Sequence, residues 1–239
     1  GAVQVVGEAT TELQARGLSP EALTVTSQRA SLISVDREGR ALHDAIMWHD
    51  KTTIPQCREI ASRISAGEIY RRTGLRVDSY FSAPKILQLR QQRKELYEAA
   101  DCLLGVQDYV ILKMTGERVT DYSQASRTLL FNLAEERWDE EILKALEMDG
   151  EKLPRTVPPG SVCGKVCSEF ALATGLAEGL PVVSAGGDQQ VAAVGMGVFD
   201  SRTAEVTTGT GSFVLTMVDA PAFHEEMRTL CSYSAIPGK

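Results

Sequence analysis

Two short glycine-containing turns within residues 180–213 constrain this chain more than any other feature. Residues 181–184 form an apolar, β-branched run typical of a buried strand, which Gly186 and Gly187 end. Residues 189–198 then carry apolar side chains at helical spacing. Asp188 therefore lies between a strand and a helix, where a carboxylate can cap the helix or face the crevice in which open α/β sheets bind ligands. A plain helix cap and a plain glycine turn are the competing interpretations.

The second turn joins two segments, residues 205–208 and 212–218, that alternate as strands do. Its residues are Thr208, Gly209, Thr210 and Gly211. Glycines allow a positive φ, and consecutive N–H groups in such a turn can form an anion-binding nest to which threonine hydroxyls add donors. An ordinary hairpin is the alternative. A carboxylate crevice followed by a hydroxyl- and glycine-rich hairpin nevertheless favours phosphoryl transfer.

The two turns also resemble a known family. Gly-Gly-Asp-Gln-Gln followed by Thr-Gly-Thr-Gly-Ser-Phe is similar to the FGGY carbohydrate kinases, as are Ser-Gln-Arg at residues 27–29, the segment 46–52 and the segment 70–85. The resemblance implies a ribonuclease H-like, actin-like α/β fold with a mixed β-sheet flanked by helices. It also implies that residues 1–239 are the N-terminal, substrate-binding domain of such a kinase.

Two parts of the family pattern are not found in the sequence. The resemblance implies a first strand with an Asp-x-Gly-Thr phosphate loop, and a C-terminal domain that holds much of the adenosine site. We expect the first to precede residue 1 and the second to follow Lys239. The chain on its own is then expected not to turn over ATP at a normal rate.

The composition excludes several classes of partner. The net charge is −7 and the pI about 5.1, which argues against nucleic acid and anionic membranes as partners. No apolar run reaches the ~18 residues of a membrane-spanning helix. The five cysteines form no dense framework, so we expect reduced thiols and a cytoplasmic protein. Cys163 and Cys167 lack the further ligands that a zinc site requires.

Hydrophobic periodicity and turn signals predict alternating strands and helices, which is typical of an α/β fold. The predicted strands or extended segments are residues 23–28, 32–35, 45–48, 103–105 and 162–167, and the predicted helices are 3–16, 53–66, 85–92, 108–114, 121–126, 139–148 and 168–174. Residues 153–160 are predicted to be a loop because they are rich in proline.

Asp188 is the candidate catalytic base. A sugar kinase must orient the acceptor hydroxyl, accept its proton and neutralise phosphate charge. Aspartic acid has an ordinary pKa of ~3.9 and is ionised at pH 7, which suffices if it takes the proton late. Gln189 follows as a neutral hydrogen-bonding partner for the substrate or a metal.

Polyols and open-chain sugars need several donors and acceptors plus one apolar wall. Arg29 supplies a fork of donors, Gln28 supplies both polarities, and Trp48 and Tyr80 supply flat rings. The resemblance places these four residues, with Asp188 and Gln189, at the substrate. Three of them have an alternative role: Arg29 as a surface cation, Trp48 as a core aromatic, and Tyr80 as a packing ring.

One departure from the family pattern bears on the substrate. Glycerol kinases carry Glu after the arginine, and this chain has Ala30 there. Xylulokinases carry Met-His in place of Gln28-Arg29, and this chain does not. We therefore expect a different small polyol or a ketose as the substrate.

The resemblance implies ATP and Mg²⁺ as cofactors, with the phosphates bound at residues 208–211, and it makes a homo-oligomer an expectation. Two other functions stay open at this point. One is a non-catalytic sugar-binding or regulatory relative, and the other is an actin- or chaperone-like ATPase with the same fold.

Overall fold

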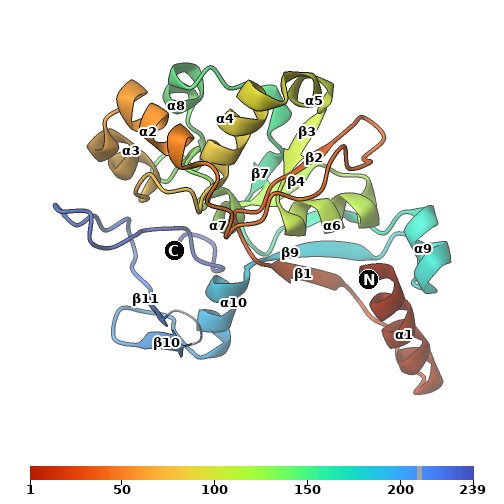
Figure 1. Cartoon of the computed structure of the whole chain (residues 1–239). Helices are drawn as coiled ribbons and strands as arrows, with labels where there is room; N and C mark the ends of the chain where they lie inside the picture. Colours follow the sequence, from red (N-terminus) through yellow and green to blue (C-terminus); the bar gives the residue numbers. More distant parts are fainter. Residues whose placement is uncertain (209–211) are drawn as a thin grey trace.

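The computed structural model describes residues 1–208 and 212–239. At its centre is a three-stranded sheet in which β9 (Pro181–Gly187) lies between β1 (Leu23–Ser27) and β8 (Val162–Lys165) (Figure 1). β1 runs parallel to β9 and β8 runs antiparallel to it. The predicted mixed sheet flanked by helices is therefore confirmed. Val182 and Ser184 of β9 are fully buried, as the central strand of a covered sheet requires.

Helices cover this sheet and also lie at both of its ends. α6 (Val106–Thr115) packs against all three strands, and α1 (Ala2–Ala15) packs against α9 (Ser168–Thr174) near the N-terminal end of β9 (Figure 1). At the opposite end α10 (Asp188–Gly195) continues directly from β9. The carboxyl ends of the parallel strands β1 and β9 therefore meet the start of α10.

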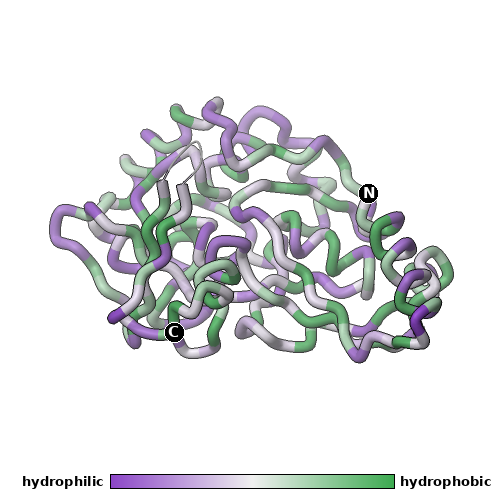
Figure 2. The backbone as a smooth tube through the Cα atoms, turned by 90° about the horizontal axis from the view of Figure 1, so that it is seen from below, coloured by the Kyte–Doolittle hydropathy of each residue, from purple (hydrophilic) through white to green (hydrophobic). Residues whose placement is uncertain are grey.

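A second, mainly helical core lies beside the sheet. It contains the fully buried residues Leu75, Leu87 and Leu130. Its helices are α2 (Ile54–Arg63), α3 (Ala66–Thr73), α4 (Ser82–Gln92), α5 (Lys94–Ala99) and α8 (Glu140–Ala145). In Figure 2 many hydrophilic stretches of the backbone lie on the outer loops, as expected when apolar residues are packed inside.

Short strand pairs complete the described chain. In order they are the antiparallel β2 (Ile33–Val35) with β3 (Cys102–Leu104), the parallel β4 (Val119–Asp121) with β7 (Arg155–Val157), and the antiparallel pairs β5 (Phe131–Asn132) with β6 (Arg137–Trp138) and β10 (Ala204–Thr208) with β11 (Ser212–Thr216). The short α7 (Tyr122–Ala125) follows β4, and a 3₁₀ turn, η1 (Gly150–Lys152), precedes β7.

Three predicted elements are wrong in part. Residues 45–48 form only a bridge between Ile46 and Leu32, because the chain already turns at Asp50, whose N–H donates to the Met47 carbonyl. The predicted helix 53–66 ends at Arg63, and Ser65 then starts α3 by accepting a hydrogen bond from the Glu68 N–H at 3.2 Å. The predicted loop 153–160 contains β7, whose partner β4 was not predicted as a strand.

Residues 224–233 pack back onto α3 and α7. The Tyr70 hydroxyl donates to the Thr229 carbonyl at 2.8 Å and accepts from the His224 N–H at 3.0 Å. The Cys231 N–H donates to the Gly74 carbonyl at 2.9 Å. In the described part of the chain, none of the helices has the length and apolar character needed to cross a bilayer.

Candidate active site

Arg29 is the most enclosed of the predicted site residues. It follows the end of β1, and its side chain is only 8% exposed. Its Nη1 donates to Gln190 Oε1 at 2.8 Å, and its Nε lies 3.3 Å from Asp188 Oδ1. The alternative of a surface cation is therefore wrong. Arg29 is held as a buried donor beside a carboxylate.

Asp188 is the first residue of α10, and Gly187 is the N-cap. Its Oδ1 accepts a hydrogen bond from the Gln189 N–H at 2.8 Å, and 45% of its side chain remains exposed. The N-terminal end of the helix and the Arg29 guanidinium both lie beside this carboxylate. Its second oxygen accepts no hydrogen bond from the described residues, so that oxygen can meet a ligand.

The glycine pair before Asp188 is more than a plain turn. Gly186 has φ = +108°, a conformation that other residues rarely adopt. A Cβ at Gly187 would lie 2.4 Å from Arg29 Cδ and 2.7 Å from Gln190 Oε1. Gly187 therefore provides the space in which the Arg29 side chain crosses the end of the sheet.

A buried polar network holds this strand end in place. The Gly187 N–H donates to Ser123 Oγ at 2.8 Å, and the Ser123 hydroxyl donates in turn to Asp121. Asp121, which is fully buried, also accepts from the Gln107 amide and from the N–H of Gln124. The start of α7 and the start of α10 are thereby tied together.

Trp48 and Tyr80, the two rings predicted to form an apolar wall, lie side by side, and Tyr80 also packs against the helical core. Their ring centroids are 5.5 Å apart and the planes are tilted by 54°. The backbone N–H of Trp48 donates to Ser31 Oγ at 3.1 Å, and Gln28 Nε2 donates to the same oxygen at 3.2 Å. Trp48 is 36% exposed, so it is not a core aromatic. Gln28, Trp48 and Tyr80 therefore form one connected group.

Lys85 fixes the turn that presents Tyr80. Its ammonium group is fully buried and donates to the carbonyls of Ser79, Tyr80 and Phe81 at 2.9, 2.6 and 2.9 Å. Burial lowers the pKa of Lys85 to about 8. Three carbonyls around one ammonium hold the backbone of residues 79–81 in a single conformation.

Gln189 and the hairpin were also predicted site residues. The Gln189 Oε1 atom is buried and has no hydrogen-bond partner among the described residues, which leaves an acceptor or a metal ligand available. Thr208 ends β10, and its hydroxyl accepts from Ser212 Oγ at 3.4 Å. Gly209, Thr210 and Gly211 lie outside the described residues. Among the described residues, no hydrogen bond or ion pair joins Thr208 to the Arg29–Asp188 pair.

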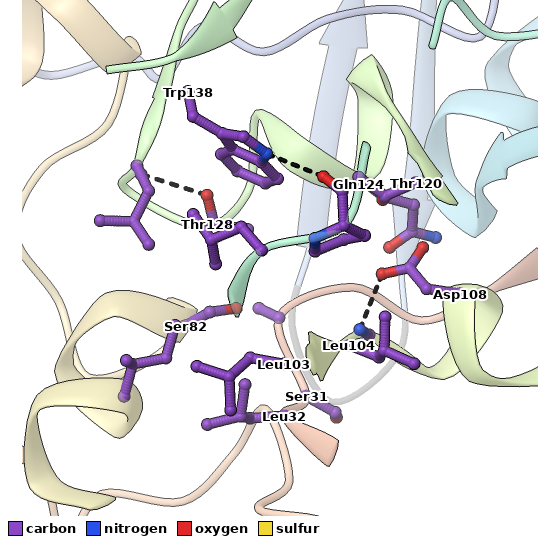
Figure 3. Close-up of a pocket in the computed structure, with 16 residues that line it drawn as sticks. Ser31, Leu32, Ser82, Leu103, Leu104, Asp108, Thr120, Gln124, Thr128 and Trp138 are labelled. Atoms are coloured by element: carbon purple, nitrogen blue, oxygen red, sulfur yellow. Dashed lines mark hydrogen bonds between the residues drawn. The ribbon is translucent and has the colours of Figure 1, made fainter. Parts of the chain in front are cut away.

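A small interior cavity of about 30 Å³ lies beside the residues that follow Arg29. Ala30 and Ser31 line it, and Figure 3 shows Asp108 and Thr120 on one side of it with Thr128 and Trp138 on another. Trp138 donates from Nε1 to the Pro154 carbonyl at 2.9 Å and packs against the helical core.

Asp108, in the first turn of α6, lines this cavity as a buried carboxyl group. Its Oδ2 accepts from the Gly105 N–H at 2.7 Å, and its Oδ1 has no partner in the described part of the chain. Burial raises the pKa of Asp108 to about 7. A cavity of this size can hold a water molecule, which would suit the unpartnered oxygen.

Two residues at the site were missed by the sequence reasoning. Gln190 supplies the acceptor for Arg29, and its place directly after Gln189 was an available signal. Arg127 follows α7 and lies over the rings of Tyr80 and Phe81 at 5.8 and 5.0 Å. No spacing in the sequence indicated Arg127, because it reaches the site from a turn far from the other motifs.

Comparison with known proteins places this site in a family. Residues 2–195 match the N-terminal domain of the FGGY family of carbohydrate kinases, and the chain belongs to that family. The fold is accordingly the ribonuclease H-like, actin-like fold.

Individual relatives agree with this assignment. The glycerol kinase of Thermococcus kodakarensis is 35% identical over 209 residues, which are 86% of this chain and 41% of the relative. The gluconate kinase from Lactobacillus acidophilus superimposes with a TM-score of 0.90 at 25% identity, over 98% of this chain and 47% of that protein. Plasmodium falciparum glycerol kinase with ADP gives 0.82 at 29% identity, over 89% and 43%. The chain thus spans less than half the length of these relatives.

Proposed function

We propose that the protein to which this chain belongs transfers the γ-phosphoryl group of ATP to a hydroxyl of a small polyol or sugar. One observation carries the proposal. A half-exposed carboxylate, Asp188, is oriented by the buried Arg29 at the end of the sheet, where a substrate hydroxyl can reach it. Relatives named glycerol kinase and gluconate kinase, one of them solved with ADP, support this class of reaction.

Asp188 is proposed to accept the proton of the attacking hydroxyl. Its ion pair with Arg29 fixes its direction, and its second oxygen, which no described residue hydrogen-bonds, is free to accept that proton. Arg29, Gln28 and Gln189 are proposed to bind the remaining substrate oxygens. Trp48 and Tyr80 would cover the apolar face of the carbon chain.

Phosphate binding is proposed for Thr208, Gly209, Thr210 and Gly211, on the basis of residue type and family. Mg²⁺ commonly takes one or two carboxylates together with phosphate oxygens and water. The Oε1 of Gln189, which has no partner among the described residues, fits that donor set, and Asp188 would contact the ion through water because its free oxygen is assigned to the substrate hydroxyl. When bound, the ion would neutralise phosphate charge. A cytoplasmic location and self-association remain predictions.

The test is ADP formation by the intact protein with a panel of polyols and ketoses. We expect acceptor-dependent turnover, and Asp188→Asn should lower it by about 10²- to 10⁴-fold because a general base is lost. Asp149→Asn is the matched control, since Asp149 only caps the remote η1 turn. Acceptor binding without phosphoryl transfer would identify a non-catalytic relative, and ATP hydrolysis independent of any acceptor would identify an actin-like ATPase.

A further inference from the structure

The peptide group between Gly186 and Gly187 leads directly into Asp188, and side-chain hydroxyls hold it at both of its polar ends. The Thr26 hydroxyl, from β1, donates to the Gly186 carbonyl at 2.8 Å. The Gly187 N–H donates to the hydroxyl oxygen of Ser123, from α7, at 2.8 Å. In a trans peptide these two groups point in opposite directions, so the two hydroxyls fix the tilt of the peptide plane from either side.

Asp121 sets the direction of the second of these hydrogen bonds. The Ser123 hydroxyl gives its proton to Asp121, and both side chains are fully buried. A hydroxyl has only one proton to donate, so the Ser123 oxygen is left to accept from the Gly187 N–H. Ser123 is therefore an acceptor that α7 presents to the end of β9.

The first hydrogen bond lies at a β-bulge. Val25 of β1 lies opposite Ser184 of β9. The next residue, Thr26, lies opposite Gly186, so Ala185 is an extra residue in β9. A bulge disrupts the regular ladder and bends the strand, which re-aims the residues that follow it. At this position the side chain of Thr26 supplies a hydrogen bond to the strand opposite.

Two glycines in succession give the backbone before Asp188 unusual freedom. Gly186 has φ = +108°, and Gly187 leaves the space that the Arg29 side chain occupies. Neither position can carry a side chain that would stiffen the backbone. Rotation about these two residues would otherwise change the direction of the Asp188 carboxylate, and the two hydroxyls restrict that rotation.

We propose that Thr26 and Ser123 are positioning residues for phosphoryl transfer, which orient the Gly186–Gly187 peptide so that the Asp188 carboxylate faces the acceptor hydroxyl. The inference rests on the proposed function, in which Asp188 accepts the proton of that hydroxyl. Neither positioning residue contacts the acceptor or ATP, because both act through the backbone. Their loss should therefore lower kcat and leave the binding of the acceptor nearly unchanged.

The experiment measures kcat and the acceptor KM of the intact protein, with the polyol or ketose that gives the fastest ADP formation. Thr26→Val replaces the hydroxyl with a methyl group and keeps the β-branched shape that suits a strand. It should lower kcat by about 10-fold, since a displacement of about 1 Å can cost about 10²-fold in rate. The acceptor KM should change by less than about 3-fold, because the proposed acceptor-binding side chains lie on other residues.

Two further substitutions in β1 separate the hydroxyl from general effects on the strand. Thr26→Ser keeps the hydroxyl and should retain kcat within about 3-fold of the wild type. Thr24→Val is the matched control. Thr24 lies two residues earlier, opposite Val183, and is exposed as Thr26 is. Its substitution should leave kcat and KM unchanged.

Ser123→Ala removes the acceptor at the other end of the same peptide and should lower kcat by about 10- to 100-fold. Because Ser123 is buried, Thr26→Val carries the test if Ser123→Ala does not fold. Combination with Asp188→Asn shows whether the effect passes through the base. In that background Thr26→Val should lower the residual kcat by less than about 2-fold, because no base is left to direct.

Equal kcat values for the wild type and Thr26→Val would overturn this inference and leave the proposed function standing. A loss of rate that persists in full beside Asp188→Asn would overturn it as well, since the hydroxyl would then act on the structure in general. If the wild type formed no ADP with any acceptor, the proposed function would fail and the inference would fail with it.

Discussion

At the scale of single residues, Gly187 shows how closely this site is packed. Replacing it with alanine would place a Cβ 2.4 Å from Arg29 Cδ, and that side chain is buried. We expect Gly187→Ala to lower the free energy of unfolding by about 1–3 kcal/mol, the usual cost of overpacking. It should also displace Arg29 from Asp188. Urea denaturation measures the first effect and acceptor titration the second.

Gly195, at the other end of the helix that follows Gly187, offers a matched control. It is the last residue of α10, and a Cβ there would meet no atom of residues 1–208 or 212–239 within 4 Å. Gly195→Ala should therefore be neutral or stabilise by up to about 1 kcal/mol, as alanine generally does in a helix. Equal effects of the two substitutions would show that the contact with Arg29 is not what requires glycine at position 187.

Some residues of the site could be predicted from the sequence, and others could not. Arg29 and Asp188 could be assigned because each follows a recognisable strand, and the glycines beside Asp188 mark a sharp turn. Arg127 could not, since its role depends on where α7 lies relative to the Tyr80 turn, which is a tertiary relation. Asp188 was expected as a possible helix cap, and the structure gives the cap position to Gly187.

At the scale of elements, Asp121 joins the start of α7 to the end of β9. Its carboxylate accepts from the Ser123 N–H at 2.8 Å and from the Gln107 amide, and Ser123 in turn holds the Gly187 N–H. Asp121→Ala leaves these buried donors unsatisfied and removes a helix cap. We expect a loss of about 3 kcal/mol in unfolding free energy, measured by urea denaturation.

Asp149→Ala is the comparison for this loss. Asp149 also caps a short turn, accepting from the Glu151 N–H at 3.0 Å, but in an exposed setting. Its removal should cost only about 1 kcal/mol. If both substitutions cost the same, the buried network around Asp121 would contribute nothing beyond the cap.

Element boundaries followed local signals where these existed. Ser65 and Glu68 have the spacing of a helix start, which would have divided the predicted helix 53–66 at the correct place. β4 and β7 are three residues long and show no periodicity, so only their pairing across the chain defines them. β1 and β9 could be predicted as strands because they have the β-branched composition of buried strands, whereas the mixed sheet was implied only by the family resemblance.

At the scale of the whole molecule, Asp108 should make stability depend on pH. Its pKa is raised from 3.8 to about 7 in the folded protein, chiefly by burial. Between these values the folded state keeps a proton that the unfolded chain has lost, so stability falls as pH rises through this window and levels off above it. Removing the ionisation with Asp108→Asn should abolish this component.

The measurement is the unfolding free energy of the wild type minus that of Asp108→Asn. We expect this difference to fall by about 2 kcal/mol between about pH 5.5 and 8, since each unit of pH corresponds to about 1.4 kcal/mol. Contributions from other carboxylates cancel in the difference. Above this window Lys85, whose pKa is lowered to about 8, has the opposite effect on stability. There the unfolded chain keeps a proton that the folded protein has released, so stability rises with pH. A constant difference would show that Asp108 is ionised in the folded protein.

The packing of residues 224–233 bears on how the molecule can be divided. The family match ends at residue 195, yet partners of Tyr70, Ser126 and Gln190 lie beyond it, at Thr229, Tyr233 and Ser232. A protein shortened at the boundary of the match would retain the carboxylate and the guanidiniums but would lose contacts that brace the turns presenting them. A fragment that folds on its own therefore has to be longer than the segment that the family match covers.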